Sequence, residues 1–302
     1  MTGTNEHLRD GLRADPNKFL EQSIKGYVLD SPLNRLKAFD DAPIFDEPLV
    51  GFADGDDPIF VQYKAIIGEI HLTPREVLSK SLAETPGVAL PDSSPVSVIS
   101  FVLPFSRTVR LSNRKETKGP SLEWNHARWH GQDFIFSLSR HVVSLLESAG
   151  HHAVAPELTK LFKWHDLPDG LASAWSQRHI AYAAGLGTFG LSDGFITPRG
   201  VAMRCGSVVT DLKLQPTPRR YADHHANCRF YAYGKCGRCM ERCPGGAITE
   251  KGHDKRRCME ILVIDQKPWL DGAHGGGYTG QYAGCGLCQT DVPCEERIPP
   301  AP

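Results

Sequence analysis

The stretch YGKCGRCMERCP, residues Tyr233–Pro244, decides how the C-terminal part of this chain folds. It holds three of the nine cysteines in the 302-residue sequence, and all nine lie within residues 205–302. A disulfide framework does not explain them, because the number is odd and the chain is long. Clustered cysteines of this kind are typical of metal or redox sites in a reducing compartment.

The spacing of these cysteines is close to the bacterial ferredoxin run C-x2-C-x2-C-x3-C-P, whose fourth cysteine ligates a second cluster. Tyr233 occupies the first position of that run, so we expect Cys228 to replace it. The same order recurs in a second group, which has one cysteine well before a C-x2-C pair and one after it: Cys258, Cys285, Cys288 and Cys294. Eight thiolates suit two 4Fe–4S clusters. The ferredoxin crossover assigns one cluster to Cys228, Cys236, Cys239 and Cys294, and the other to Cys243, Cys258, Cys285 and Cys288.

Zinc is the alternative metal, because two C-x2-C pairs could form one tetrahedral site of four thiolates. That site would leave Cys228, Cys243, Cys258 and Cys294 without a role, and it does not explain the proline after Cys243. The ninth cysteine, Cys205, stands at the edge of a predicted strand, and we expect it to be a buried structural thiol.

The composition is that of a globular chain, with 40% hydrophobic and 23% charged residues. The net charge of −1 argues against a dedicated nucleic-acid binder. The longest apolar run, Val96–Phe105, is about half a membrane span. The N-terminal stretch MTGTNEHLRDGLRADP is polar and contains no segment for secretion, so we expect a cytoplasmic protein with no membrane partner.

Hydrophobic periodicity and capping residues predict several elements. We expect short helices within residues 1–50 and then a loop rich in Asp and Pro. Further helices are expected at 60–70, from Thr73-Pro74 onward, at 130–149 and at 173–184, and buried strands at 96–103 and 206–212. The composition changes at residue 215 towards Pro, Arg, His, Cys and Gly, which predicts a domain boundary there.

The segment Trp175–Ser192, WSQRHIAYAAGLGTFGLS, followed by two cluster motifs, resembles the epoxyqueuosine reductase family and the related reductive dehalogenases. The stretch His126–Gly150 also resembles the helix that precedes this signature there, and the likeness spans roughly residues 95–294. The resemblance implies an α+β fold with a nitroreductase-like α/β cofactor domain followed by a two-cluster bacterial ferredoxin-like domain. Cobalamin would be held between them. The implied units are an N-terminal region at 1–94, a corrinoid and substrate domain at 95–214, and the ferredoxin-like domain at 215–302.

Candidate site residues follow from this signature. We expect Arg178 to position an anionic group, and Tyr182 or His179 to donate a proton, with Tyr182 preferred because a phenol stays neutral when buried. The resemblance assigns corrinoid binding to Gly185, Gly187, Gly190 and Ser192. As alternatives, Arg178 could be a structural partner, His179 and Tyr182 part of the core, and the glycines a tight turn.

The chain also departs from the family pattern. Gln177 replaces the glutamate before Arg178, and Leu171 stands where the family has its aspartate, with Asp169 two residues away.

These features predict an iron–sulfur, corrinoid-dependent reductase that takes electrons from a ferredoxin- or flavodoxin-type donor of low potential. Because the charge is near neutral and no helical-repeat segment follows Pro302, we expect a small organic substrate rather than tRNA. Two alternatives stay open: an iron–sulfur electron-transfer protein without a corrinoid, and an epoxyqueuosine-tRNA reductase.

Overall fold

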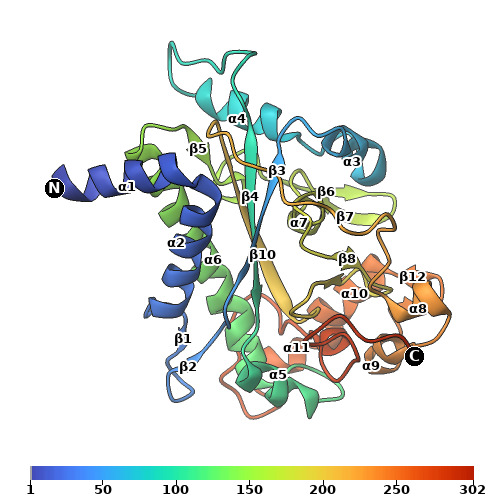
Figure 1. Cartoon of the computed structure of the whole chain (residues 1–302). Helices are drawn as coiled ribbons and strands as arrows, with labels where there is room; N and C mark the ends of the chain where they lie inside the picture. The colour runs from blue at the N-terminus through green and yellow to red at the C-terminus, as the bar shows by residue number, and fades with distance from the viewer. Residues whose placement is uncertain (1) are drawn as a thin grey trace.

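A four-stranded antiparallel sheet forms the centre of the molecule (Figure 1). The computed structural model describes residues 2–302, with side chains described from Leu8 onward. The sheet has the order β3-β4-β10-β5. Its strands are β3 (Leu49–Asp54), β4 (Ser97–Pro104), β5 (Ala153–Val154) and β10 (Met203–Thr210).

Strand β4 is buried on both faces, as its nearly continuous apolar sequence predicts. Ile99, Phe101 and Leu103 point into one hydrophobic core, and the alternate residues Val98 and Val102 point into the other. The predicted strand at 96–103 is therefore confirmed. The strand predicted at 206–212 is also present as β10, but it begins three residues earlier.

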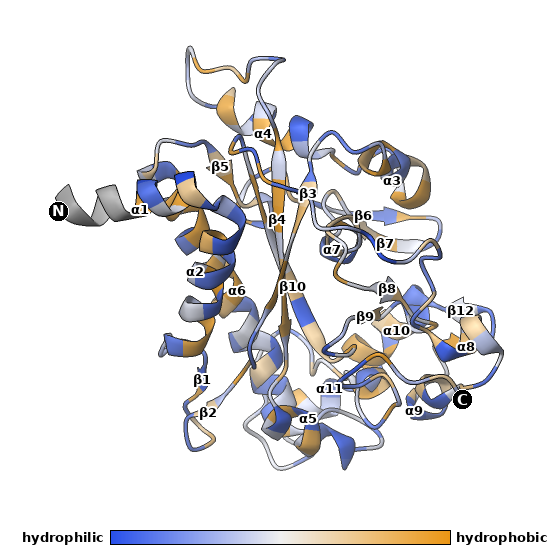
Figure 2. Ribbon diagram, viewed as in Figure 1, coloured by the Kyte–Doolittle hydropathy of each residue, from blue (hydrophilic) through white to orange (hydrophobic). Residues whose placement is uncertain are grey.

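Helices cover both faces of the sheet (Figure 1). One face carries α1 (Thr2–Ala14), α2 (Pro16–Asp30), α5 (Arg107–Arg114) and α6 (Leu122–Ser148); the other carries α3 (Ile59–Ile67), α4 (Pro74–Leu82) and α7 (Gln177–Ala183). Figure 2 shows apolar and polar residues alternating around these helices, as expected for helices that bury one side. Within residues 2–302, no helix has the length and apolarity needed to cross a bilayer.

The predicted helices are confirmed with changed boundaries. Helix α4 starts at the capping box in which the Thr73 hydroxyl accepts from the Glu76 amide and the Glu76 carboxylate accepts from Thr73. Helix α6 begins at Leu122, eight residues before the predicted start, because the Ser121 hydroxyl caps it. Helix α7 does not begin at Ser173, because that residue ends a strand.

Strand β3 corrects the prediction of a loop between the early helices and α3. Its six residues pair with β4 in antiparallel register from Leu49 to Asp54. The Asp and Pro residues on both sides of this short strand are typical of loops, so the sequence pattern did not predict it. Gly51 lets it lie against α7, since a Cβ at that position would be 2.5 Å from the Ala184 carbonyl oxygen.

The rest of the chain consists of short elements. The sheet region adds β1 (Arg35–Leu36), β2 (Ala42–Pro43), η1 (Pro156–Leu158), β6 (Trp164–Leu167), β7 (Gly170–Ser173), β8 (Thr188–Phe189) and β9 (Phe195–Ile196). The C-terminal region contains α8 (Arg229–Tyr233), α9 (Arg238–Arg242), β11 (Ile248–Thr249), β12 (Gly252–His253), α10 (Lys255–Glu260), η2 (Ile261–Asp265), α11 (Lys267–Leu270) and η3 (Leu287–Gln289). Cysteines make up much of the core of this region.

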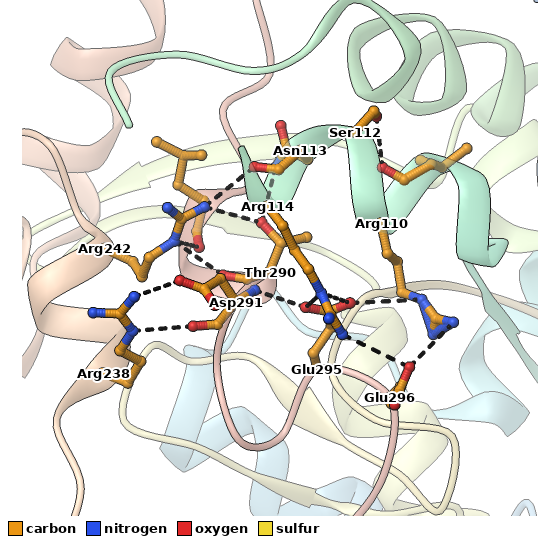
Figure 3. Close-up of polar contacts among 12 residues, drawn as sticks. Arg110, Ser112, Asn113, Arg114, Arg238, Arg242, Thr290, Asp291, Glu295 and Glu296 are labelled. Carbon is orange, nitrogen blue, oxygen red and sulfur yellow. Dashed lines mark hydrogen bonds and ion pairs between the residues drawn. The ribbon is translucent and has the colours of Figure 1, made fainter. Parts of the chain in front are cut away.

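Arg242 joins the C-terminal region to α5 (Figure 3). Its buried guanidinium donates to the carbonyl oxygens of Asn113 at 3.2 Å and Glu116 at 2.7 Å. Within the C-terminal region, the same guanidinium donates through its Nε to the Thr290 carbonyl oxygen at 3.0 Å. Charge-assisted hydrogen bonds of this kind are among the stronger ones in proteins. Arg242 directly precedes Cys243, so this contact fixes the position of a predicted cluster ligand.

Glu295 makes a second contact of the same kind directly after Cys294 (Figure 3). Its side chain is 1% exposed, and its two oxygens accept from the Arg114 Nε at 2.9 and 2.7 Å. The Arg110 Nε lies 3.8 Å from the same carboxylate. A buried carboxylate is tolerated only when it is paired and hydrogen-bonded, and Arg114 and Arg110 supply that pairing.

Replacing Glu295 by glutamine should lower the melting temperature by roughly 5–15 °C, because it removes the buried carboxylate that pairs with Arg110 and Arg114. Glu296→Gln is the matched control, since its side chain is 45% exposed and contacts the same two arginines at 3.4 and 3.8 Å. An exposed pair of this kind contributes little. Equal melting temperatures for the two variants would contradict the importance assigned to Glu295.

Candidate functional site

The structure gathers eight of the nine cysteines into two sets of four. The outer set lies around a small cavity beside α8 and α9 and contains Cys228, Cys236, Cys239 and Cys294. Cys236 is solvent-exposed, whereas Cys228 is buried. Burial, followed by the charges of the three other thiols of this set, raises the pKa of Cys294. Four mutually close thiols are the donor set that a 4Fe–4S cluster requires.

The inner set contains Cys243, Cys258, Cys285 and Cys288. Burial raises the pKa of Cys258 to about 11, and the charges of Cys285 and Cys243 add to that rise. Free thiols in such a place stay protonated, whereas a bound metal centre would hold them as thiolates. These eight sulfurs fit two clusters by their chemistry and by their number per set.

The two sets are neighbours. Burial raises the pKa of Cys288 well above its ordinary value, and the charges that add to it come from its own set and from Cys239 of the outer set. The chain also joins the two sets. Cys239 of the outer set lies on α9, and Cys243 of the inner set is the residue directly after that helix. Electrons could therefore pass from one set to the other over a short path.

Cys205 belongs to neither set. It lies on β10, where its sulfur is 3.4 Å from the Met203 sulfur. Burial raises its pKa to about 12, against the opposing effect of the charges of Arg178 and Arg204. The side chain is a protonated thiol, as a structural role requires.

The glycine signature packs mainly against the protein's own chain. A Cβ on Gly185, which has φ +72°, would lie 2.7 Å from the Pro218 carbonyl oxygen. A Cβ on Gly187 would meet the Ile196 carbonyl oxygen. Gly190 and Ser192 line the cavity of the outer cysteine set. The corrinoid-binding role of these four residues stays a prediction, and their packing gives it no support.

Arg178 lies between the inner set and the sheet. Its positive charge acts on Cys258 of the inner set and on Cys205 of β10. Its Nη1 donates to the Asp193 carbonyl oxygen at 2.5 Å. Burial disfavours the charged Asp193 carboxylate, but the hydrogen bond with His253 at 3.2 Å and the nearby cations lower its pKa.

His179 and Tyr182 project from the same helix but have different surroundings. Burial lowers the pKa of His179 to about 3, and nearby positive charges add to this, so the ring is neutral near pH 7. Its Nδ1 is 2.8 Å from the Ser176 hydroxyl. Tyr182 lines an open polar pocket together with Gln62 and Arg219. A neutral His179 is a poor acid, which leaves Tyr182 as the stronger of the two predicted donors.

The residues at the family's aspartate position lie on the β6–β7 hairpin. Leu171 is 39% exposed, and Asp169 is an exposed residue between the two strands. The hairpin contacts α10, where Arg256 donates to Asp166 at 3.0 Å. No hydrogen bond connects Asp169 with the cysteine sets among the described side chains, residues 8–302.

A polar cluster at the junction of the sheet and the C-terminal region was missed by sequence reasoning. It consists of Arg128, Gln132, Glu157, Gln177, Arg204 and Tyr282, which we call the junction cluster. Arg204 donates to the Gln132 amide oxygen, and Arg128 donates to the Tyr282 hydroxyl. These residues come from α6, η1, α7, β10 and the loop after α11. Because they are far apart in the sequence, no motif or spacing predicts that they meet.

Comparison with known proteins supports the iron–sulfur assignment. Residues 234–294 match the family of 4Fe-4S double cluster binding domains. An epoxyqueuosine reductase of Synechocystis sp. is 32% identical over 128 residues, which are 41% of this chain and 39% of that protein. That of Bacillus cereus is 25% identical over 211 residues, 69% of this chain and 50% of that protein. The resemblance to epoxyqueuosine reductases is thus confirmed, although the chain spans half or less of the length of these two relatives.

A catabolic reductive dehalogenase has a similar fold, with a TM-score of 0.50 at 12% identity, covering 93% of this chain and 37% of that one. A selenomethionine-labelled epoxyqueuosine reductase superposes with a TM-score of 0.46 at 15% identity, covering 91% of this chain and 66% of that one. The mixed helix and sheet of the structure and the match of residues 234–294 confirm the coarse fold class with a double-cluster region, whereas the nitroreductase-like assignment stays a prediction.

Replacing Cys239 by serine should remove the outer cluster and leave the inner one. The iron content of anaerobically purified protein should then fall from about eight to about four per chain. Cys205→Ser is the matched control, because Cys205 lies in neither set, and it should keep all the iron. A zinc-containing protein, or a loss of iron from Cys205→Ser as large as that from Cys239→Ser, would contradict this assignment.

Proposed function

We propose that this chain is an iron–sulfur reductase that passes electrons from the outer cysteine set through the inner set to an acceptor at the sheet. The observation that carries the proposal is the pair of four-cysteine sets, of which the outer reaches the surface at Cys236 while the charge of Arg178 on α7 acts on Cys258 of the inner. The chain's similarity to epoxyqueuosine reductases supports the same reaction class. We place the protein in the cytoplasm, because nine free cysteines need a reducing compartment.

Electrons would enter at the outer set, where Cys236 reaches the surface. Arg229 is the first residue of α8 and Lys235 follows the end of that helix, next to this set, and neither forms an ion pair with a described side chain. The exposed rings of Tyr231 and Tyr233 complete this surface. A basic surface with apolar rings suits an acidic one-electron donor of the ferredoxin or flavodoxin type.

A corrinoid is the acceptor that we propose, held in a nitroreductase-like domain beside the junction cluster. Gln177, whose amide oxygen accepts from the Ser207 hydroxyl at 2.7 Å, offers its amide NH2 group there. Such a group suits the amide-bearing rim of a corrin. When bound, a corrinoid supplies a strongly reducing cobalt centre. The chain's own residues would orient the ring and keep water away from it.

The proposed substrate is a small organic molecule. Tyr182 lines an open polar pocket that such a molecule could enter, and its phenol can donate a proton to a basic anion. Epoxyqueuosine in tRNA is the second candidate, because the curated relatives are named epoxyqueuosine reductases and one related structure contains an epoxyqueuosine-modified tRNA stem loop.

Tyr182→Phe should keep both cofactors and lower turnover by ~100-fold, the usual contribution of a general acid. Tyr27→Phe, a phenol on α2 that contacts Ser137 at 2.7 Å on the other side of the sheet, is the control and should turn over normally. Turnover of Tyr182→Phe at the rate of the control would remove this residue from the role.

The proposal is tested by adding hydroxocobalamin to the reconstituted, dithionite-reduced protein under nitrogen. We expect about one cob(II)alamin retained per chain after gel filtration, and reoxidation of the clusters as the cobalamin is reduced. Lys235→Glu should slow cluster reduction by an acidic ferredoxin, and added salt should diminish the difference. Clusters that reduce normally with no cobalamin retained would favour the electron-transfer protein.

A further inference from the structure

Two arginines face one another inside the junction cluster, whose one carboxylate, Glu157, hydrogen-bonds to neither of them. Arg204 extends from β10 and donates to the amide oxygen of Gln132 on α6. Arg128, one helical turn before Gln132, donates to the hydroxyl of Tyr282 and lies 5.4 Å from its ring centroid. Both guanidinium groups thus have neutral partners, and neither forms an ion pair with a described side chain.

Without a bound anion, this arrangement of charges destabilises the folded protein. Burial, together with the positive charge of Arg128, lowers the pKa of Arg204 to about 9 against the opposing charge of Glu157. The Arg204 Nε is shielded from solvent and has no acceptor. Buried charges in proteins are normally paired, and an unpaired one destabilises the fold.

Glu157 does not balance the two arginines. Burial raises the pKa of its carboxyl despite the opposing charges of Arg204 and Arg128, and its hydrogen bond is with Gln177 rather than with either guanidinium. Even when ionised, one carboxylate faces two cations. The cluster therefore lacks at least one negative charge.

We propose that Arg204 and Arg128, with Gln132 beside them, bind the carboxylate or phosphate group of a small organic ligand. The planar guanidinium donors suit two-oxygen anions, and the free Nε supplies a further donor. A Cβ at Gly284, the residue before Cys285 of the inner set, would lie 3.1 Å from the Arg128 side chain, so the site adjoins that set. An anion held there leaves the rest of the molecule next to the inner cysteine set, where the proposed reductase would deliver electrons. The anion site itself rests on geometry; only its assignment to the substrate rests on the proposed function.

Arg204→Met gives the clearest test, with inorganic phosphate and benzoate as probes at constant ionic strength. In the wild-type holoprotein each probe that fits should raise the melting temperature more than chloride does, since a ligand that binds only the folded state stabilises it. Arg204→Met should weaken binding of that probe at least ~10-fold. It should also raise the melting temperature of the ligand-free protein, because an unpaired buried charge is replaced by an apolar side chain.

Arg107→Met is the matched control, an exposed arginine at the start of α5, and it should change neither property. A lower melting temperature for ligand-free Arg204→Met, together with no effect of either probe on the wild type, would show a structural role and overturn the proposal. Arg204→Lys should bind the probe with intermediate strength, because it keeps the charge and loses the planar donors.

Cobalamin retention identifies the source of the anion. If Arg204→Met loses the probe but keeps cobalamin and all its iron, the anion belongs to the substrate, as proposed. If it loses cobalamin as well, and phosphate competes with cobalamin in the wild type, the anion is the corrinoid phosphate and the substrate assignment is wrong. A wild type that binds the probe but no cobalamin would contradict the corrinoid part of the proposed function while the anion site stands.

Discussion

The attachment of the cysteine-rich region to α5 is the contact on which the rest of the structure depends. That region has short helices and few apolar residues of its own, so it cannot hold its shape by hydrophobic burial alone. Arg242 and Glu295 supply the missing order through charged hydrogen bonds to α5 and to buried carbonyl groups. Each directly adjoins a cysteine of a different set, Cys243 in one case and Cys294 in the other. The same contacts that join the two regions therefore position both sets.

This attachment also brings the inner set close to the sheet. The charge of Arg178 on α7 then acts on Cys258, and Arg204 of the junction cluster extends from β10 to Gln132 on α6. The fold thus produces a path from the exposed Cys236 through two neighbouring cysteine sets to a buried polar site. This order is the one that the proposed reductase needs, with a donor at the exposed set and the acceptor at the buried site.

The sequence predicted those features that depend on residues close together along the chain. The cysteine runs predicted two sets of four, and the structure brings together the same two sets. The apolar run of β4 and the capping box of α4 were equally readable. Strand β3 was not, because six residues between Asp- and Pro-rich stretches show no usable period. The junction cluster could not be found at all, since Arg128 and Tyr282 are 154 residues apart and meet only when both regions pack.

The most direct test of the central claim is low-temperature EPR on the anaerobically reduced protein, combined with iron and sulfide analysis. Two adjacent 4Fe–4S clusters predict about eight irons per chain and two signals that broaden one another when both are reduced. A single uncoupled signal, or zinc in place of iron, would contradict the account.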